Sequence, residues 1–404
     1  MKTKPTQPAE RVVSLDVLRG FAVLGILVMN IQNFSMPTAA YLNPTVYGNF
    51  EGLNKLVWMF SHLFAGMKFI TIFSMLFGAG IVLFTERLKA KGIHSLALHY
   101  RRTGWLFVIG LAHAYLLWYG DILVNYAITA LWVVMFRNMK PKKLLLFGLL
   151  FVSVASLLYV FSGLSIPFMD EASRQEMLES WHPPAEIVQQ EIAKYRGDWL
   201  DQMPHRMEEA LTMQTFVYFF KTGWRSGGVM LIGMVLFKWG VFSAAKSKKW
   251  YLKLAVISLF LGLAIVAFGM KTNLDAGFSL EYSFFLGFQY NYWGSLLVSM
   301  GYVGLIMLWV KSDFLNRLKS ALQAIGRMAL TNYLLQTIIC TIIFYGHGFG
   351  LFGKVERTGQ ILIVFAVWIV MVIASPVWLK YFKYGPFEWL WRSLTYRRLQ
   401  QFSK

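Results

Sequence analysis

The sequence predicts an all-α integral membrane protein, a polytopic bundle of about ten transmembrane helices with both termini in the cytoplasm. Apolar residues make up 57% of the 404-residue chain, charged residues only 15%, and apolar runs of membrane-spanning length recur from end to end. A soluble domain carries about 25% charged and about 45–50% apolar residues. The composition therefore excludes a soluble, a disordered or a disulfide-framed protein.

Apolar runs of the required length, about 20 residues, mark the predicted helices. We predict spans at 12–34, 54–85, 102–119, 122–137, 143–162, 212–238, 250–270, 282–310, 322–346 and 359–382. The runs 54–85 and 282–310 are longer than one span requires, so we expect them to tilt, break or begin as interfacial segments. The first run is too long for a cleaved signal peptide and contains Arg19, which indicates a retained helix.

The spans divide the chain into three parts. A five-helix N-terminal half covers 1–162, an external loop covers 163–211, and a five-helix C-terminal half covers 212–404. The loop is acidic and aromatic, and its segment 185–196 has the pattern of an amphipathic helix. We weigh two roles for this loop: a solvated cap, or a lid over an outward-facing site.

The basic residues give the predicted orientation, because cytoplasmic loops are enriched in lysine and arginine. The loops on the side of the N-terminal tail, which holds Lys2, Lys4 and Arg11, carry about 26 of the 39 basic residues, and the opposite loops carry roughly eight. The net charge of +19 therefore reports topology, and no nucleic-acid partner is expected. The single cysteine, Cys340, excludes an intrachain disulfide and fits a bacterial cytoplasmic (inner) membrane.

Ionisable residues inside a span are costly and are candidates for function. In the first span, Asp16 and Arg19 share a helix face, and Asn30 returns to nearly the same face about three turns after Arg19. This stripe indicates either an ion pair and polar contact that fix packing or the wall of a polar cavity. In the second span, Lys68 lies too deep to reach water easily, and His62 precedes it.

The third and fourth spans meet at a tight turn between His113 and Asp121. Asp121 is well placed as the N-cap of the fourth helix, where a carboxylate accepts backbone N–H bonds. The alternative is that Asp121 orients His113 directly or through water. An imidazole held by a carboxylate in a dry site is the usual general base. Both interpretations stay open at this point.

Two later spans carry further polar residues. In the sixth span, Lys221 and Arg225 share a face, which indicates either an anion site or snorkelling outward to lipid headgroups. The ninth span has Arg327 near its cytoplasmic end, where a phosphate-bearing ligand could meet it. The same span contains three polar residues that we predict to line a cavity or bind a ligand: Thr331, Asn332 and Gln336. No nucleotide-binding or metal-binding motif occurs, and no metal site is predicted.

Five blocks of the chain resemble the bacterial YeiB family of inner-membrane proteins: SLDVLRGFAVLGILVMNI, KFITIFSMLFGAGI, RRTGWLFVIGLAHAYLLWYGDIL, GRMALTNYLLQTIICTIIFY and YGPFEWLWR. The blocks occur in the family's order and span nearly the whole chain. The resemblance implies an inner-membrane protein whose C-terminal half carries the family's own domain, for which no activity is defined.

The LDxxRGxA pattern that includes Arg19 is also similar, more distantly, to that of membrane acyltransferases, including lysosomal heparan-α-glucosaminide N-acetyltransferase and bacterial sugar O-acyltransferases. This resemblance implies an acyltransferase-like membrane fold that moves an acyl group from a cytoplasmic thioester donor to an acceptor on the other side. In the O-acyltransferases the Arg is followed eleven residues later by the presumed catalytic His, whereas this chain has Asn30 there. Either the base lies elsewhere or the chemistry is lost; for the base, His113 is favoured over His62 because its block matches the YeiB pattern.

We thus predict a membrane-embedded acyltransferase in which His113 and Asp121 are catalytic. Acyl-CoA would be a co-substrate and not a permanently bound cofactor, and the acceptor would be a glycan, a lipid or a small molecule. The residues predicted to bind donor or substrate are Arg19, Asn30, Lys68, Arg225, Arg327, Thr331, Asn332 and Gln336. Two alternatives stay open: a transporter of an anionic or lipid-like solute, and a non-catalytic lipid-binding membrane protein. The predicted partners are the lipid bilayer, the donor, the acceptor and a second copy of the chain.

Overall fold

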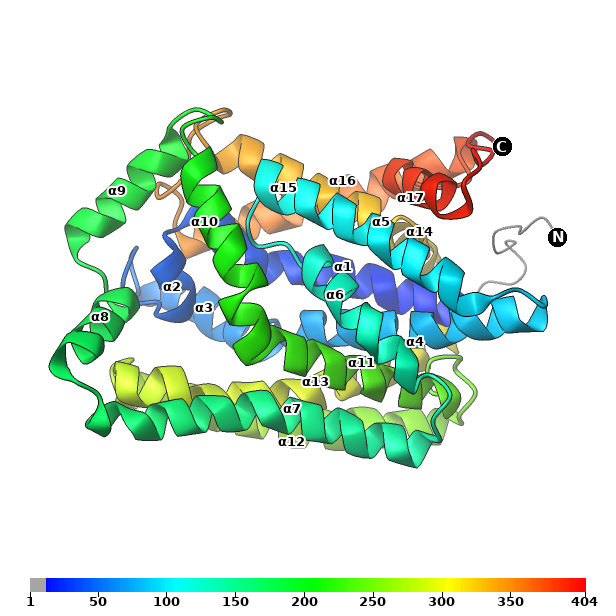
Figure 1. Cartoon of the computed structure of the whole chain (residues 1–404), viewed down its shortest axis with the longest axis horizontal. Coiled ribbons are helices and arrows are strands. Elements are labelled where there is room, and N and C mark those ends of the chain that lie inside the picture. The colour runs from blue at the N-terminus through cyan, green and yellow to red at the C-terminus, as the bar shows by residue number, and fades with distance from the viewer. Residues whose placement is uncertain (1–11) are drawn as a thin grey trace.

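The computed structural model describes residues 12–404 and is an elongated bundle of α-helices (Figure 1). The prediction of an all-α protein is confirmed for these residues. The N-terminal tail with Lys2, Lys4 and Arg11 lies outside the described residues.

The helices of the N-terminal half are α1 (Val13–Ser35), α2 (Thr38–Leu42), α3 (Gly52–Phe64), α4 (Lys68–Ala90), α5 (Ser95–Leu116), α6 (Leu123–Val133), η2 (Val134–Phe136) and α7 (Pro141–Ser165). The external loop begins with η3 (Ile166–Phe168) and folds as α8 (Glu171–Trp181), α9 (Ala185–Arg196) and α10 (Met203–Gln214). The predicted amphipathic segment 185–196 is α9.

The C-terminal half contains η4 (Tyr218–Thr222), α11 (Gly223–Lys238), α12 (Lys248–Asp275), η5 (Leu280–Gly287), α13 (Phe288–Val310), α14 (Asn316–Arg327), α15 (Ala329–Phe344), α16 (Arg357–Tyr381) and α17 (Pro386–Tyr396). The elements η4 and η5 are π-helical turns that lead directly into α11 and α13. The over-long run 282–310 therefore begins with a π-helical segment, and its tilt and its place in the membrane remain predictions.

Among residues 12–404, six helical stretches are long and apolar enough to cross a membrane: Val13–Ser35, Gly52–Ala90, Pro141–Phe168, Lys248–Asp275, Leu280–Val310 and Arg357–Tyr381. A seventh forms if α14 and α15, which meet at 86°, are counted together. The chain is thus a multi-pass membrane protein. Helices also occupy the other predicted spans, but they are shorter or more polar, so ten spans remains a prediction.

Two of the predicted spans are broken by backbone geometry. The run 54–85 divides into α3 and α4 at Met67, which has a left-handed φ of 66°. The run 322–346 divides into α14 and α15 at Met328, where φ is −112° and ψ is 32°. Neither joint contains a proline, but a glycine lies close to each: Gly66 directly precedes Met67, and Gly326 lies two residues before Met328.

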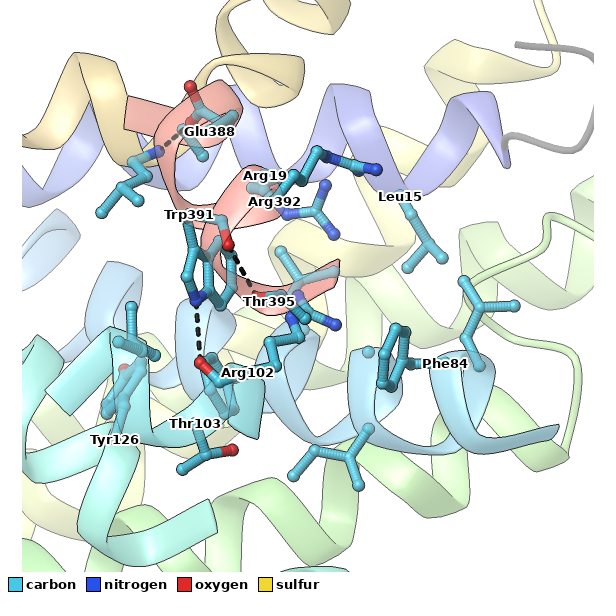
Figure 2. A pocket seen from close by; sticks show the side chains of 18 of the residues that line it. Leu15, Arg19, Phe84, Arg102, Thr103, Tyr126, Glu388, Trp391, Arg392 and Thr395 are labelled. Atoms are coloured by element: carbon cyan, nitrogen blue, oxygen red, sulfur yellow. Dashed lines mark hydrogen bonds between the residues drawn. The ribbon is translucent and has the colours of Figure 1, made fainter. Parts of the chain in front are cut away.

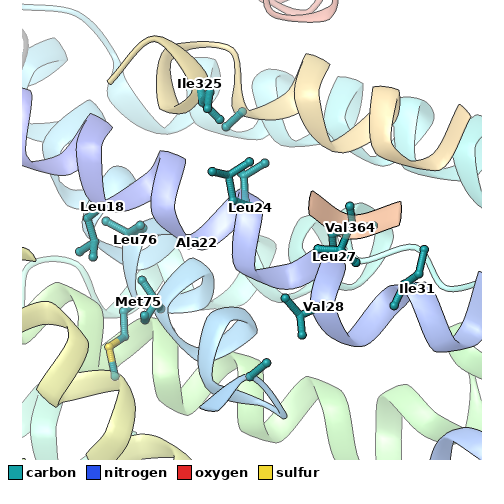
Figure 3. Packing of buried hydrophobic residues seen from close by; sticks show 14 of the residues in the cluster. Leu18, Ala22, Leu24, Leu27, Val28, Ile31, Met75, Leu76, Ile325 and Val364 are labelled. Carbon is teal, nitrogen blue, oxygen red and sulfur yellow. The ribbon is translucent and has the colours of Figure 1, made fainter. Parts of the chain in front are cut away.

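Helix α1 lies at the centre of the bundle, with 78% of its most apolar window buried. In Figure 3, its leucines pack against Met75 and Leu76 of α4 and against Ile325 of α14. Glycines allow the closest approach: a Cβ on Gly326 would lie 1.8 Å from the carbonyl oxygen of Asp16, and one on Gly20 would lie 2.0 Å from that of Leu322. Small residues at such crossings let membrane helices pack backbone to backbone.

The two ends of the bundle differ. The start of α1 and helix α17 lie at one end, and α8 and α9 lie at the other (Figure 1). We call the segment from α8 through α10, which is predicted to be external, the external cap. The cap is fixed to the bundle by hydrogen bonds to backbone carbonyls, from Trp199 Nε1 to Leu116 O at 2.8 Å and from Arg196 Nε to Phe352 O at 2.8 Å. Which end faces the cytoplasm remains a prediction from the basic residues.

Candidate functional site

A buried histidine–carboxylate pair lies where α5 ends and α6 begins. The Nδ1 atom of His113 is 2.7 Å from Oδ1 of Asp121, and both side chains are only 1% exposed. The other carboxylate oxygen, Oδ2, accepts the backbone N–H of Val124 at 2.6 Å. Asp121 therefore caps the first turn of α6 and contacts His113 directly, so the two interpretations of this residue hold together.

The second ring nitrogen of His113 contacts a residue from a distant helix. Its Nε2 atom lies 2.9 Å from Oγ1 of Thr337 on α15. The two contacts fit a ring that donates from Nδ1 to the Asp121 carboxylate and accepts at Nε2 from the Thr337 hydroxyl. The sequence reasoning did not find Thr337, because it lies 224 residues from His113 and has no motif of its own.

A pocket of about 280 Å³ opens at the end of the bundle that holds α17. Figure 2 shows side chains from α1, α4, α5 and α17 gathered around it. We call it the basic pocket because its wall carries six basic side chains and two carboxylates: Arg19, Arg87, Lys91, Arg102, Arg327 and Arg392, with Asp16 and Glu388. Arginines converging on one pocket are typical of phosphate recognition.

Aromatic and acidic neighbours hold the arginines of the basic pocket in place. Arg19 Nη1 donates to Asp16 Oδ1 at 2.8 Å, which is the ion pair predicted for the first span. The Arg102 guanidinium lies between two rings, 4.7 Å from the centroid of Phe84 and 4.4 Å from that of Trp391. The Trp391 indole also donates to the Arg102 carbonyl at 2.8 Å (Figure 2), which fixes α17 against α5.

Tyr333 separates the basic pocket from the histidine–carboxylate pair. Its side chain belongs to the pocket wall, and its ring centroid lies 5.1 Å from that of His113. Its hydroxyl accepts the backbone N–H of Ile122, the residue after Asp121, at 3.3 Å. The inner end of the pocket and the buried pair are therefore one side chain apart, although His113 and Asp121 are not part of the pocket wall.

Only two of the predicted binding residues, Arg19 and Arg327, line the basic pocket. The three polar residues of α15 bind neighbouring helices instead. Thr331 donates to Glu388 at 2.6 Å, Asn332 to the Ile325 carbonyl at 3.1 Å, and Gln336 to the Val23 carbonyl at 3.0 Å. Their contacts favour a packing role over the ligand-binding role predicted for them. Asn30 is half-buried and lies outside the pocket wall.

Lys68 and Arg225 also lie away from the basic pocket. The Lys68 ammonium donates to Asn291 Oδ1 at 2.6 Å, and its side chain is fully buried. The Arg225 guanidinium donates to the Tyr292 carbonyl at 3.0 Å and to Ser295 Oγ at 2.8 Å. Outward snorkelling is therefore wrong for Arg225, because the side chain is buried between α11 and α13. The substrate-binding role of both cations stays a prediction.

Several components of the site escaped the sequence reasoning. Arg102, at the start of the predicted third span, is counted only as a topology signal, and so are Arg87, Lys91 and Arg392. A cluster of basic residues at adjacent helix ends predicts orientation, but it does not reveal that the side chains share one pocket. Among residues 12–404, no three His, Cys, Asp or Glu side chains come together as a metal site would require.

Comparisons with known proteins place the chain in a family. Residues 236–398 match the family described as "Protein of unknown function (DUF418)". The chain is 34% identical to the uncharacterized protein YeiB of Escherichia coli (strain K12), covering 96% of this chain and 97% of that protein. It is 32% identical to the uncharacterized protein YxaH of Bacillus subtilis (strain 168), covering 99% and 98%. The relatives match the chain almost from end to end, and the chain belongs to the YeiB family of DUF418 proteins.

Proposed function

We propose that the protein is an acyltransferase of the bacterial inner membrane, which moves an acyl group from acyl-CoA to a hydroxyl or amine acceptor. The observation that carries the proposal is the buried pair of His113 and Asp121 next to the inner end of the basic pocket. A base oriented by a carboxylate supplies acyl-transfer chemistry, and six cations around one pocket suit the phosphates of coenzyme A.

The proposed topology brings donor and acceptor from opposite sides. The basic pocket lies at the end that the basic loops predict to be cytoplasmic, where acyl-CoA is found. His113 lies in the last turn of α5, toward the end covered by the external cap. The acceptor would approach from the cap side. The acyl group would pass from the donor in the basic pocket to the acceptor beside Tyr333.

The chemical roles follow from the hydrogen bonds. His113 acts as the general base: it removes the proton of the group that attacks the acyl carbonyl and returns that proton to the group that leaves. Asp121 holds the required ring tautomer and stabilises the imidazolium that forms. The basic pocket anchors the remote phosphates, so their binding energy positions the thioester for attack.

Donor binding is tested with the full-length protein in lipid nanodiscs and acetyl-CoA or palmitoyl-CoA as the probe. Calorimetry should detect binding that weakens about tenfold or more in Arg327→Ala, since a charge-assisted contact to phosphate contributes about 1.5–3 kcal/mol. The matched control is Arg174→Ala, which removes a half-exposed arginine of the external cap. Equal affinities in the two variants, or no binding in the wild type, would contradict the donor site.

Transfer is tested by incubating the same protein with radiolabelled acyl-CoA and a bacterial lipid and glycan extract. We expect a labelled product that disappears in His113→Gln and persists in His182→Gln, a substitution in the external cap. Bound acyl-CoA without any acylated product would contradict the proposal. Flux of an anionic solute through reconstituted vesicles, with no covalent change, would establish the transport alternative instead.

A further inference from the structure

Thr337, Asp121 and His113 form the three-residue arrangement that enzymes use for covalent acyl transfer. A hydroxyl lies 2.9 Å from one imidazole nitrogen, and a carboxylate lies 2.7 Å from the other. In serine hydrolases and their variants, the same order of nucleophile, base and orienting acid activates the hydroxyl. Resting on the proposed function, we infer that Thr337 is a nucleophile that carries the acyl group as an ester between donor and acceptor.

The hydrogen bond of Thr337 differs from those of three other buried threonines, whereas Thr331 bonds the Glu388 carboxylate and Thr103 lies 3.5 Å from His99 Nε2. Thr71 and Thr85 donate to carbonyls four residues earlier in their own helices, at 2.6 and 2.8 Å, and Thr341 donates to the Ile338 carbonyl at 3.1 Å. Such bonds to the helix backbone are the usual arrangement for a buried threonine. The Thr337 hydroxyl is directed at the catalytic imidazole instead.

The position of Thr337 suits a relay. It follows Tyr333 by four residues on α15, so the two side chains lie on one helix face, a turn apart. Tyr333 forms the inner wall of the basic pocket, and Thr337 lies one turn farther from it, toward the cap. The ring of Trp118 also lies near His113, with its centroid 6.4 Å from that of the imidazole.

The first step transfers the acyl group to the enzyme. Thr337 Oγ1 attacks the thioester carbonyl carbon while His113 Nε2 takes the hydroxyl proton. The carbon–sulfur bond breaks, the proton passes from His113 to the sulfur, and coenzyme A leaves as the free thiol. The products are an ester on Thr337 and one thiol, with no oxidant or reductant involved.

The second step delivers the acyl group to the acceptor. His113 takes the proton of the acceptor hydroxyl or amine, which attacks the ester carbonyl. The bond from the carbonyl carbon to Thr337 Oγ1 breaks, and His113 returns the proton to that oxygen. Because coenzyme A has already left, donor and acceptor never occupy the site together, which suits ligands that arrive from opposite sides of a membrane.

The experiment is a half-reaction without acceptor. Wild-type protein in nanodiscs is mixed with acetyl-CoA or palmitoyl-CoA, thiol release is followed at early times, and the peptide containing Thr337 is examined by mass spectrometry. We expect a burst of no more than one thiol per protein and an acyl adduct on Thr337. The adduct should resist neutral hydroxylamine, which cleaves a thioester on the nearby Cys340 but not an oxygen ester.

Thr337→Val should abolish the burst and the adduct, and Thr337→Ser should retain both. The matched control is Thr341→Val, one turn farther along α15, which removes an equally buried hydroxyl and should leave the burst unchanged. Two results would overturn the relay and leave the proposed acyltransferase standing. One is product formation in Thr337→Val at the wild-type rate. The other is wild-type protein that transfers the acyl group to an acceptor but shows no burst when the acceptor is left out. Failure of the wild type to bind either acyl-CoA would overturn both.

Discussion

Asp121 has two tasks at once, because one of its oxygens contacts His113 and the other caps α6. Asp121→Asn keeps an oxygen for one of these contacts but presents an amide that favours the wrong ring tautomer. We expect acyl transfer to fall by about 10²-fold or more, with the protein still folded. The measurement is the rate of label transfer from acyl-CoA. Asp170→Asn is the control, since Asp170 accepts from the Ser173 N–H at the start of α8; equal rates in the two variants would refute the catalytic role.

Glu209 on α10 gives the external cap a dependence on pH. Burial, with Glu191 and Glu208 adding to it, raises the pKa of the Glu209 carboxyl to about 7. The folded cap thus favours the protonated carboxyl, and protonation adds to the free energy of unfolding of the cap. This contribution is complete below the usual pKa near 4.5 and is lost as the pH rises through about 7. We expect amide protection in 203–214, corrected for intrinsic exchange, to be lower at pH 8 than at pH 5.5.

We compare Glu209→Gln with Glu186→Gln, a substitution on the exposed side of α9. Glu209→Gln should remove most of the pH dependence, and Glu186→Gln should leave it unchanged. A pH dependence that survives unchanged in Glu209→Gln would show that another group governs the cap. Hydrogen exchange with mass spectrometry resolves the segment directly.

At the residue scale, the sequence predicts contacts that are local and misses those that are not. His113 and Asp121 can be paired from the sequence because only a tight turn separates them. Thr337 contacts the same ring from another helix, and its position depends on how α15 packs beside α5. Glu388 is similar: its carboxylate accepts the N–H groups of Leu330 and Thr331 at the start of α15, and no local pattern predicts this.

At the scale of helices, the crossing of α1 and α14 positions Arg19 and Arg327. A Cβ on Gly326 would lie 1.8 Å from the Asp16 carbonyl oxygen, a distance that the backbone cannot absorb without moving. We expect Gly326→Ala to separate the two helices and weaken acyl-CoA binding by about tenfold or more, a cost of about 1.4 kcal/mol. Titration calorimetry in nanodiscs measures it.

Gly104→Ala on α5 is the matched control, because a Cβ there would meet no atom within 4 Å and an alanine favours the helix. If Gly326→Ala binds acyl-CoA as tightly as Gly104→Ala does, then the α1–α14 contact does not set the geometry of the basic pocket.

Helix positions follow from the apolar runs, and helix boundaries do not. Long runs of apolar residues must be buried in the protein or face lipid, where a helix satisfies the hydrogen bonds of the backbone. Every predicted span accordingly contains helix. The breaks at Met67 and Met328 depend on packing against other helices, and an apolar residue at such a joint reads as part of a continuous span. The predicted span 122–137 corresponds to α6 and η2, which together cover Leu123–Phe136.

For the whole molecule, the distribution of charge predicts that the basic pocket and the external cap lie on opposite sides of the membrane. Cys340→Ser removes the only cysteine, which is fully buried. In that background we expect Lys404→Cys to react with a membrane-impermeant maleimide only after the cells are opened, and Gln175→Cys to react in spheroplasts. Reaction of both positions from the same side would refute the proposed topology.

The central claim is that the basic pocket and the pair of His113 and Asp121 form one acyl-transfer site. A map of the protein with a non-cleavable thioether analogue of acyl-CoA tests it most directly. We expect phosphates among Arg19, Arg102 and Arg327, and the ketone carbonyl of the analogue, one methylene from its sulfur, within reach of His113 and Thr337, with the Tyr333 ring displaced. An analogue seated elsewhere, or one whose carbonyl stays on the far side of an unmoved Tyr333, would contradict it.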